Sequence, residues 1–196
     1  MLDISFDDFM SLPSKQRKKM LNDPELLKPL VRKNMKEKRY KHSLSVADTC
    51  RMLAMCHHVD PDKAYMAGLL HDVCKFPDSD KSGVLENYLK YYDPEKLEMN
   101  AHPVYHAWVA KYYLREKCNF HDSKILNAIY NHTICNSKDK LSIILYIADK
   151  REPLRGIDDG ILELAKKDLM NAYRILCVDV EKYLEEKNER IVKNGI

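Results

Sequence analysis

The sequence has 196 residues, which is enough for one well-buried core and short for two. Its net charge of +3 is mild, and acids and bases are interleaved, as in Glu163, Lys166 and Asp168. A nucleic-acid binder usually concentrates its basic residues on one face. We therefore expect no nucleic-acid partner, and a small anionic substrate fits better. With no signal peptide and no apolar run near the roughly 20 residues of a membrane span, we expect a cytoplasmic protein without membrane contact.

The composition favours helices, because glycines number only five and leucine, lysine, glutamate, methionine and alanine are abundant. No repeat or low-complexity linker divides the chain, so we predict a single all-α domain. The six cysteines contain no CxxC pair and lie mainly among apolar residues, which predicts reduced core thiols. They are Cys50, Cys56, Cys74, Cys118, Cys135 and Cys177.

Residues 1–22 are expected to form an N-terminal extension without catalytic chemistry. The domain itself is expected to span residues 23–196. It begins where Asp23, Pro24 and Glu25 combine an N-cap, a first-turn proline and a first-turn acid. We expect Pro29 to kink or break this helix early.

Two helices with apolar faces should follow, the first beginning at His42. The second starts at Asp60-Pro61 and is almost wholly apolar through Gly68, so it belongs in the centre of the fold. It runs into the adjacent pair His71 and Asp72. Neighbouring residues on a helix point about 100° apart. The two side chains can therefore converge on one ion only where other helices supply the remaining ligands.

Residues 80–100 are predicted to form a short helix and a loop, with a tyrosine cluster that we interpret as packing rather than nucleobase stacking. Pro103 then favours a helix that begins at His102, which places that histidine at a helix mouth. His106 lies one turn later and could face the same site by its i, i+4 spacing. We favour a packing or solvent role for His106 over a role in supporting that site.

A helix over residues 122–132 should end at His132. Ser137 can cap the next helix, which is apolar on most sides until Asp149. A long final helix should start near Asp158 or Asp159. Every candidate ligand thus lies on a helix or at its end, and the ordered set is His42, His71, Asp72, His102, His132 and Asp149.

Any one of these residues alone would be read as a helix cap or a satisfied buried hydrogen bond. The six together indicate a metal site. Histidine nitrogens and carboxylate oxygens without thiol pairs suit iron, manganese or zinc better than calcium or magnesium alone. A serine or cysteine nucleophile is poorly supported, because the sequence contains no GxSxG motif and no phosphate-binding glycine loop.

Five segments make the sequence similar to a known family over roughly residues 25–190. They read KRYKHSLSVA, AGLLHDVCK, AHPVYHA, AIYNHT and YIADKREPLR. They resemble the HD-domain metal-dependent phosphohydrolases, and more narrowly the YqeK branch, a family of symmetrical diadenosine tetraphosphate hydrolases. The third segment departs from the family pattern, which usually has a glycine at the position of His106. The positions of the metal ligands all match.

The resemblance implies an HD-type helical bundle that holds two divalent metal ions, with iron preferred and manganese or zinc as alternatives. One ion would be bound by His42, His71, Asp72 and Asp149, and the second by Asp72, His102 and His132. Asp72 would bridge the two. A metal-bound hydroxide would then attack the polyphosphate and split diadenosine tetraphosphate symmetrically into two ADP molecules.

Lys75 follows Asp72 by three residues and projects from nearly the same side of the helix. It could therefore contact a phosphate and stabilise charge that develops during attack, so Asp72 and Lys75 are the expected catalytic residues. Arg39 and Arg155 are further candidates for substrate binding. Two alternatives stay open, a nucleotidase or phosphatase acting on mononucleotides and a nucleotide sensor without turnover. The expected partner is a dinucleoside polyphosphate, and a homodimer is also left open.

Overall fold

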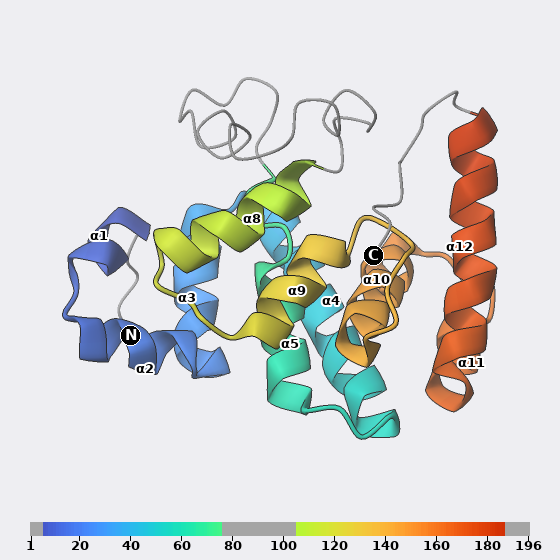
Figure 1. The fold of residues 1–196 in the computed structure, drawn as a ribbon, viewed down its shortest axis with the longest axis horizontal. Helices are drawn as coiled ribbons and strands as arrows, with labels where there is room; N and C mark the ends of the chain where they lie inside the picture. The colour runs from blue at the N-terminus through green and yellow to red at the C-terminus, as the bar shows by residue number, and fades with distance from the viewer. Residues whose placement is uncertain (1–5, 76–104, 187–196) are drawn as a thin grey trace.

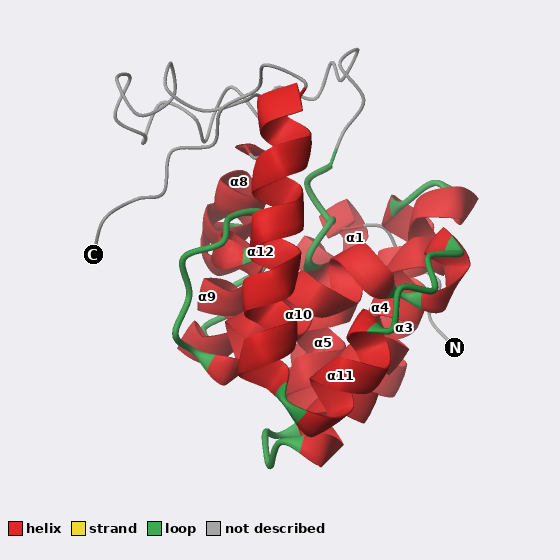
Figure 2. Ribbon diagram, turned by 90° about the vertical axis from the view of Figure 1, so that its right-hand side faces the viewer, coloured by secondary structure: helices red, strands yellow, loops and turns green. Residues whose placement is uncertain are grey.

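The computed structural model describes residues 6–75 and 105–186. All regular elements in these two segments are helical, which confirms the predicted all-α fold (Figure 2). None of the described helices is long and apolar enough to cross a membrane. The helices are α1 (Phe6–Ser11), α2 (Ser14–Leu21), α3 (Pro24–Asn34), α4 (Glu37–Cys56), α5 (Pro61–Leu70), α8 (Tyr105–Glu116), α9 (Ser123–Asn131), α10 (Lys140–Arg151), the 3-10 helix η2 (Pro153–Arg155), α11 (Ile161–Lys167) and α12 (Leu169–Glu186).

Helices α4, α5 and α10 form the centre of the bundle, and α9 packs against both α5 and α10 (Figure 1). Helices α1 to α3 lie at one end of the molecule, and α12 stands at the other. Every residue of α5 from Ala64 to Leu70 is buried, as is every residue of α10 from Leu141 to Asp149. A helix that is apolar on all sides must be covered on all sides. The central position predicted for α5 is therefore confirmed.

Aspartate side chains cap several of these helices at their N-termini. Asp23, Asp60 and Asp122 each accept a hydrogen bond from a backbone N–H in the first turn that follows. Asp139, rather than the predicted Ser137, caps α10 by accepting the N–H of Ser142. The Ser137 hydroxyl instead accepts the N–H of Asp139, one step before the helix begins.

The structure corrects three predicted helix boundaries. Helix α4 begins at Glu37, more than one turn before His42, where the sequence placed its start. Helix α3 continues through Pro29 to Asn34 without a break, and its buried face, which includes Leu30, is packed into the core. The predicted long final helix is divided into α11 and α12 at Asp168, whose extended backbone interrupts the helical hydrogen bonding. The Asp168 side chain then accepts the N–H of Asn171 in the first turn of α12.

The N-terminal helices contribute to the same hydrophobic core as the rest of the bundle. Phe9, Met20 and Leu21 are buried in the cluster that also contains residues of α3, α4 and α5. Helices α1 and α2 both pack on α3. The domain boundary expected at residue 23 stays a prediction.

Cys135 and Cys177 form a disulfide, so the prediction that all six cysteines are reduced is wrong for this pair. The two residues are 42 positions apart, and their Cα atoms lie 5.7 Å from each other. That separation lies within the range a disulfide requires. Spacing in the sequence could not reveal the pair, because it depends on how the segment between α9 and α10 lies against α12. Cys50, Cys56, Cys74 and Cys118 are free thiols.

Gly68 permits the closest approach between the central helices. A Cβ atom at this position would lie 2.6 Å from the Cα atom and 2.8 Å from the backbone nitrogen of Ala47 in α4. Both are backbone atoms, which cannot turn aside as a flexible side chain could. The small size of glycine therefore sets the distance between α4 and α5.

We expect Gly68→Ala to lower the free energy of unfolding, because the added methyl group would push these two helices apart. Overpacking of this kind costs about 1–3 kcal/mol, and each kcal/mol lowers the thermal midpoint of a chain this long by about 2–4 °C. Thermal unfolding followed by circular dichroism measures the change. An unchanged midpoint would show that the two helices can separate at this crossing without cost.

Candidate metal centre

His71 and His132 are positioned by the same local device at the ends of two helices. Each follows directly after the last residue of its helix, α5 or α9. The carbonyls of a last helical turn lack partners within the helix. The Nδ1 atom of His71 lies 2.6 Å from the carbonyl oxygen of Gly68, and that of His132 lies 2.6 Å from the carbonyl oxygen of Ile129. With Nδ1–H donating to a carbonyl, Nε2 of each ring carries the lone pair that a metal requires.

A carboxylate orients the third histidine. His42 lies in the second turn of α4, and its Nδ1 atom is 3.0 Å from Oε1 of Glu152, which is buried. The His42 Nε2 atom then lies 3.2 Å from Oδ1 of Asp149. Sequence reasoning missed Glu152. Because Glu152 precedes Pro153 and accepts the N–H of Leu154, its local pattern indicates only a helix cap.

Asp72 lies between two groups of histidines. Its Oδ2 atom is 3.8 Å from Nε2 of His42 and 3.5 Å from Nε2 of His71. Its Oδ1 atom is 3.1 Å from Nε2 of His106 and 3.9 Å from Nε2 of His132. The donor atoms form two groups, His42 with His71 and Asp72, and Asp72 with His106 and His132, each within 4.8 Å. Asp72 is thus the residue common to two candidate metal sites.

Asp149 extends the first of these groups. Its Oδ1 atom lies 3.6 Å from Nε2 of His71, in addition to its contact with His42. Asp149 comes from the last turn of the buried helix α10, which packs on both α4 and α5. The structure therefore brings together the four residues expected to hold the first ion, which are His42, His71, Asp72 and Asp149.

His106, for which we favoured a packing or solvent role, is a member of the second group, so the structure brings it to the candidate site. It is buried in the first turn of α8, and its Nε2 atom lies 3.1 Å from Nε2 of His132. Helix α8 packs on α9, so the beginning of one meets the end of the other. The i, i+4 spacing between His102 and His106 was the sequence signal for this position. His102 lies outside the described residues.

The electrostatics of the cluster favour a cation. Burial alone would raise the pKa of Asp72, but His71 and His106 hold it well below the usual range, so the carboxylate stays ionised. Burial and repulsion from His71 and His106 lower the pKa of His132 well below its usual value, which leaves it in the neutral form that binds metals. The Nε2 atom of His71 is buried and has no hydrogen-bond partner among the described residues. An unpaired buried nitrogen of this kind suits a metal ligand.

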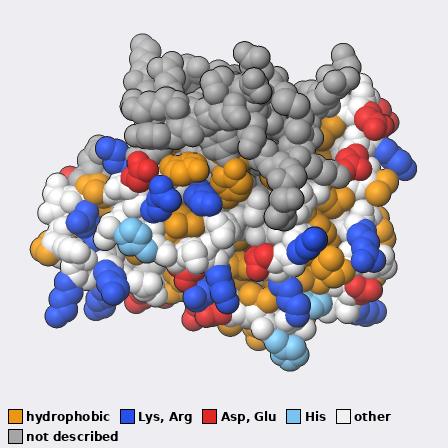
Figure 3. Space-filling model, in the orientation of Figure 1, with side chains coloured by type: hydrophobic (Ala, Val, Ile, Leu, Met, Phe, Trp, Pro, Cys, Tyr) orange, Lys and Arg blue, Asp and Glu red, His pale blue; other side chains and the backbone are white. Residues whose placement is uncertain are grey.

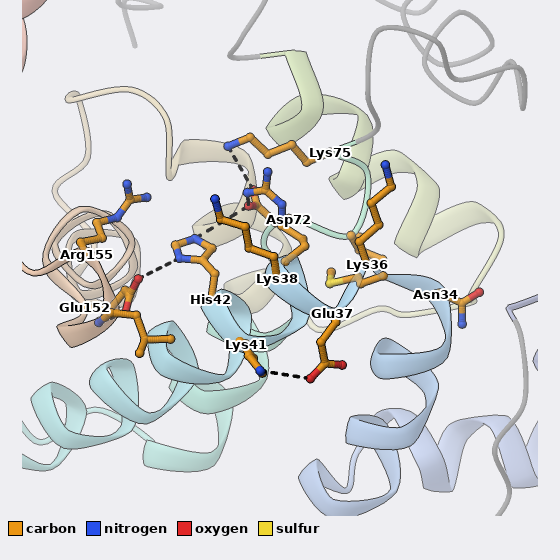
Figure 4. A pocket seen from close by; sticks show the side chains of 14 residues that line it. Asn34, Lys36, Glu37, Lys38, Lys41, His42, Asp72, Lys75, Glu152 and Arg155 are labelled. Atoms are coloured by element: carbon orange, nitrogen blue, oxygen red, sulfur yellow. Dashed lines mark hydrogen bonds and ion pairs between the residues drawn. The ribbon is translucent and has the colours of Figure 1, made fainter.

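All three predicted substrate-binding cations lie beside the ligand carboxylates, and Figure 4 shows Lys75 pointing toward Asp72. Arg39 Nη1 is 2.5 Å from Oδ2 of Asp72, and Lys75 Nζ is 3.7 Å from Oδ1 of the same residue. Arg155 Nη2 is 3.0 Å from Oδ1 of Asp149, and its Nε–H donates to the Asp149 carbonyl. The site therefore combines buried negative charge with a rim of positive charge.

Lys150 adds a further cation behind the cluster. Its ammonium lies 3.5 Å from Oδ2 of Asp149 and donates to the carbonyl of His132 at 3.1 Å. Burial lowers its pKa, although Asp149 opposes that effect. Lys150 thus links the ends of α9 and α10 at the point where each supplies a candidate ligand.

A pocket of about 1150 Å³ opens beside this centre. His42, Asp72, Lys75 and Arg155 line it beside the centre, and residues at the start of α4 line the rest (Figure 4). Elsewhere on the described part of the visible face, lysines and arginines are spread among acidic and uncharged side chains (Figure 3). The pocket therefore carries several cations next to the candidate metal ligands.

We expect Glu152→Gln to weaken metal binding by about 10- to 100-fold, the usual effect of losing a carboxylate that orients a ligand histidine. The neutral amide would no longer fix the tautomer of His42 or increase its basicity. Titration of the metal-free protein with a divalent ion measures the change. Glu163→Gln, on the exposed side of α11, is the control, and equal affinities for the two variants would contradict the role of Glu152.

Comparison with known proteins identifies the family. A family model described as HD domain matches residues 39–154. The chain is 31% identical to a symmetrical bis(5'-nucleosyl)-tetraphosphatase of Halalkalibacterium halodurans, with 83% of this chain and 87% of the relative covered. A Staphylococcus aureus protein of the same name is 33% identical, with 69% of this chain and 71% of the relative covered.

Two further findings extend the comparison. The chain is 32% identical to a Mycoplasma genitalium protein named probable nicotinate-nucleotide adenylyltransferase/Ap4A hydrolase, with 81% of this chain but 47% of that protein covered. The chain therefore spans about half the length of that relative. A crystal structure described as a predicted HD superfamily hydrolase involved in NAD metabolism from Clostridium acetobutylicum matches at a TM-score of 0.70, 26% identity and 92% coverage of each chain. The chain thus belongs to the HD-domain family.

Proposed function

We propose that the protein hydrolyses diadenosine tetraphosphate, or a closely related dinucleoside polyphosphate, symmetrically into two nucleoside diphosphates. The observation that carries this proposal is the position of Asp72 between two histidine groups, at the inner end of a pocket with a basic rim. The names of the Halalkalibacterium and Staphylococcus relatives support the substrate and the symmetry of cleavage. The pocket volume also exceeds the roughly 300–1,000 Å³ typical of small-molecule sites, which suits a substrate larger than a mononucleotide.

Two divalent ions fit the donor set. His42, His71, Asp72 and Asp149 would hold one ion, and Asp72, His132 and His106 would hold the other, joined by His102 as the sequence predicts. Nitrogen and carboxylate donors suit iron, manganese or zinc, and the family resemblance favours iron among them. When bound, such ions lower the pKa of a coordinated water and neutralise charge on the phosphate.

The residues of the chain orient these ligands and bind the substrate. The carbonyls of Gly68 and Ile129 and the carboxylate of Glu152 fix the three imidazole rings. Lys75 and Arg155 lie at the rim, where they would contact phosphate oxygens and stabilise negative charge that develops in the transition state. Arg39 would also contact phosphate oxygens, once a metal ion takes the place of its guanidinium beside Asp72.

Symmetric hydrolysis requires attack by a water oxygen on one of the two inner phosphorus atoms. The bond from that phosphorus to the central bridging oxygen breaks, and one ADP leaves with this oxygen. The attacked half becomes the second ADP, and the two protons of the water are shared between the products and solvent. Attack on an outer phosphorus would instead give AMP and ATP.

Hydrolysis of diadenosine tetraphosphate in oxygen-18 water tests the proposal. We expect ADP as the sole initial product, with one labelled oxygen for every two ADP molecules, by chromatography and mass spectrometry. ATP among the first products would contradict symmetric cleavage. Release of phosphate from mononucleotides without turnover of any dinucleoside polyphosphate would instead favour a nucleotidase, and binding without any turnover would favour a nucleotide sensor.

A further inference from the structure

The pocket extends beyond the candidate metal centre along the first turn of α4. The segment from Asn34 to Arg39 lines this outer part, which includes two lysines, Lys36 and Lys38, that have no role in the hydrolysis described above. Arg39, at the inner end of the segment, touches Asp72. Lys36 is the N-cap residue of α4, and Arg39 lies in the first turn of that helix. A line of cations therefore leads outward from the centre.

The carboxylates that line the pocket are already engaged by other groups. Glu37 pairs with Lys41 at 3.6 Å, and Glu152 pairs with His42. Asp72, the remaining acid of the lining, contacts Arg39 and the histidines. Among the described residues, neither Lys36 nor Lys38 has an acidic partner, and both are exposed to the pocket.

The side chains at the start of α4 point to two different sides of the helix. In Figure 4, Lys36 and Lys38 extend to the side on which Lys75 lies, whereas Glu37 and Lys41 turn to the opposite side and pair with each other. Among the residues that the structure describes, the outer part of the pocket thus presents ammonium groups whose charge no carboxylate pairs. Lys36 also occupies the N-cap position of α4 without a side-chain cap, so the positive end of the helix dipole adds to their charge.

We propose that Lys36 and Lys38 bind the phosphates of the half of the substrate that leaves, a nucleoside diphosphate, and thereby select dinucleoside polyphosphates over mononucleotides. This inference rests on the proposed function. Lys75, Arg39 and Arg155 surround the ligand carboxylates and serve the phosphate that is attacked. A substrate with four phosphates has further negative charges, and Lys36 and Lys38 lie where the pocket continues outward from Arg39.

The test compares the double variant Lys36→Ala/Lys38→Ala with the metal-loaded wild-type protein. We expect KM for diadenosine tetraphosphate to rise by about tenfold or more with kcat little changed, because contacts made equally in ground and transition states affect KM alone. The affinity for ADP, measured by calorimetry, should fall by a similar factor. Hydrolysis of p-nitrophenyl phosphate, which has no second nucleotide, should be unchanged.

Two variants control for other causes. Lys140→Ala removes the same charge at a position outside the pocket lining, where the side chain donates to the carbonyl of His57, so its KM should match wild type. Lys36→Arg/Lys38→Arg keeps both charges and should restore most of the affinity for ADP.

The outcomes separate this inference from the proposed function. If wild type cleaves diadenosine tetraphosphate and the double alanine variant keeps its KM and its ADP affinity, the subsite is refuted and the proposed function stands. If the wild-type protein does not cleave that substrate, and the double variant binds ADP more weakly than the wild type, the proposed function fails and the diphosphate subsite stands. Equal losses for ADP and p-nitrophenyl phosphate would also refute the subsite, because they would indicate a general effect on the centre.

Discussion

Asp72→Asn is expected to abolish hydrolysis and to remove most of the bound metal. The two oxygens of Asp72 face different histidine groups, so both candidate sites lose a charged ligand in one substitution. The asparagine side chain is neutral and offers one acceptor oxygen instead of two. Loss of one charge-stabilising group already costs about 10²–10³ in rate. We therefore expect kcat/KM to fall by more than about 10³-fold.

Elemental analysis and steady-state kinetics on the same preparation check this result. Asp48→Asn is the matched control, because the substitution makes the same chemical change at an exposed position of α4. Asp149→Asn should be less damaging to metal content, since Asp149 contacts the histidines of one group only. An Asp72→Asn protein that retains its metal and more than a tenth of its activity would contradict the bridging role.

Lys75→Ala is expected to slow turnover by about a hundredfold, the typical cost of removing one donor that stabilises transition-state charge, while metal content stays near that of wild type. Lys75 lies 3.7 Å from Oδ1 of Asp72 and is partly exposed at the pocket wall. Its ammonium can therefore reach a phosphate, and it is not required as a metal ligand. The fall should appear in kcat as well as in kcat/KM, because the contact strengthens as charge develops.

Lys75→Arg and Lys140→Ala complete this experiment. Arginine keeps the charge in a different geometry and should recover part of the rate. Lys140 lies at the start of α10, where it donates to the carbonyl of His57, and its removal should leave kcat unchanged. Wild-type turnover by Lys75→Ala would show that another cation serves the reacting phosphate.

Much of the fold and of the first candidate site could be predicted because the signals are local. The apolar run that ends at His71 requires a buried helix. The adjacent histidine and carboxylate are then shielded from water, and buried polar groups of this kind need a partner. The same reasoning places Asp149 at the end of a helix that is buried on most sides. The starts of α3 and α5 were predicted correctly from an aspartate followed by a proline in the first turn. Capping depends only on neighbouring residues, so this signal is local.

The remaining features depend on contacts between distant segments. Glu152 meets His42 across 110 positions of the chain, and His106 meets His132 across 26, so no local pattern specifies either pair. The Cys135–Cys177 disulfide has the same origin. The division of the last helix at Asp168 follows from a backbone conformation that its apolar periodicity did not indicate. Tertiary packing, rather than propensity, decides these positions.

Anomalous diffraction from crystals of the metal-loaded protein tests the central claim most directly. We expect two peaks per chain about 3.5–4 Å apart, the usual separation in two-metal sites. One should lie among His42, His71 and Asp149 and the other beside His106 and His132, with Asp72 between them. A single peak, or a second peak that does not contact Asp72, would contradict a dinuclear centre bridged by this residue.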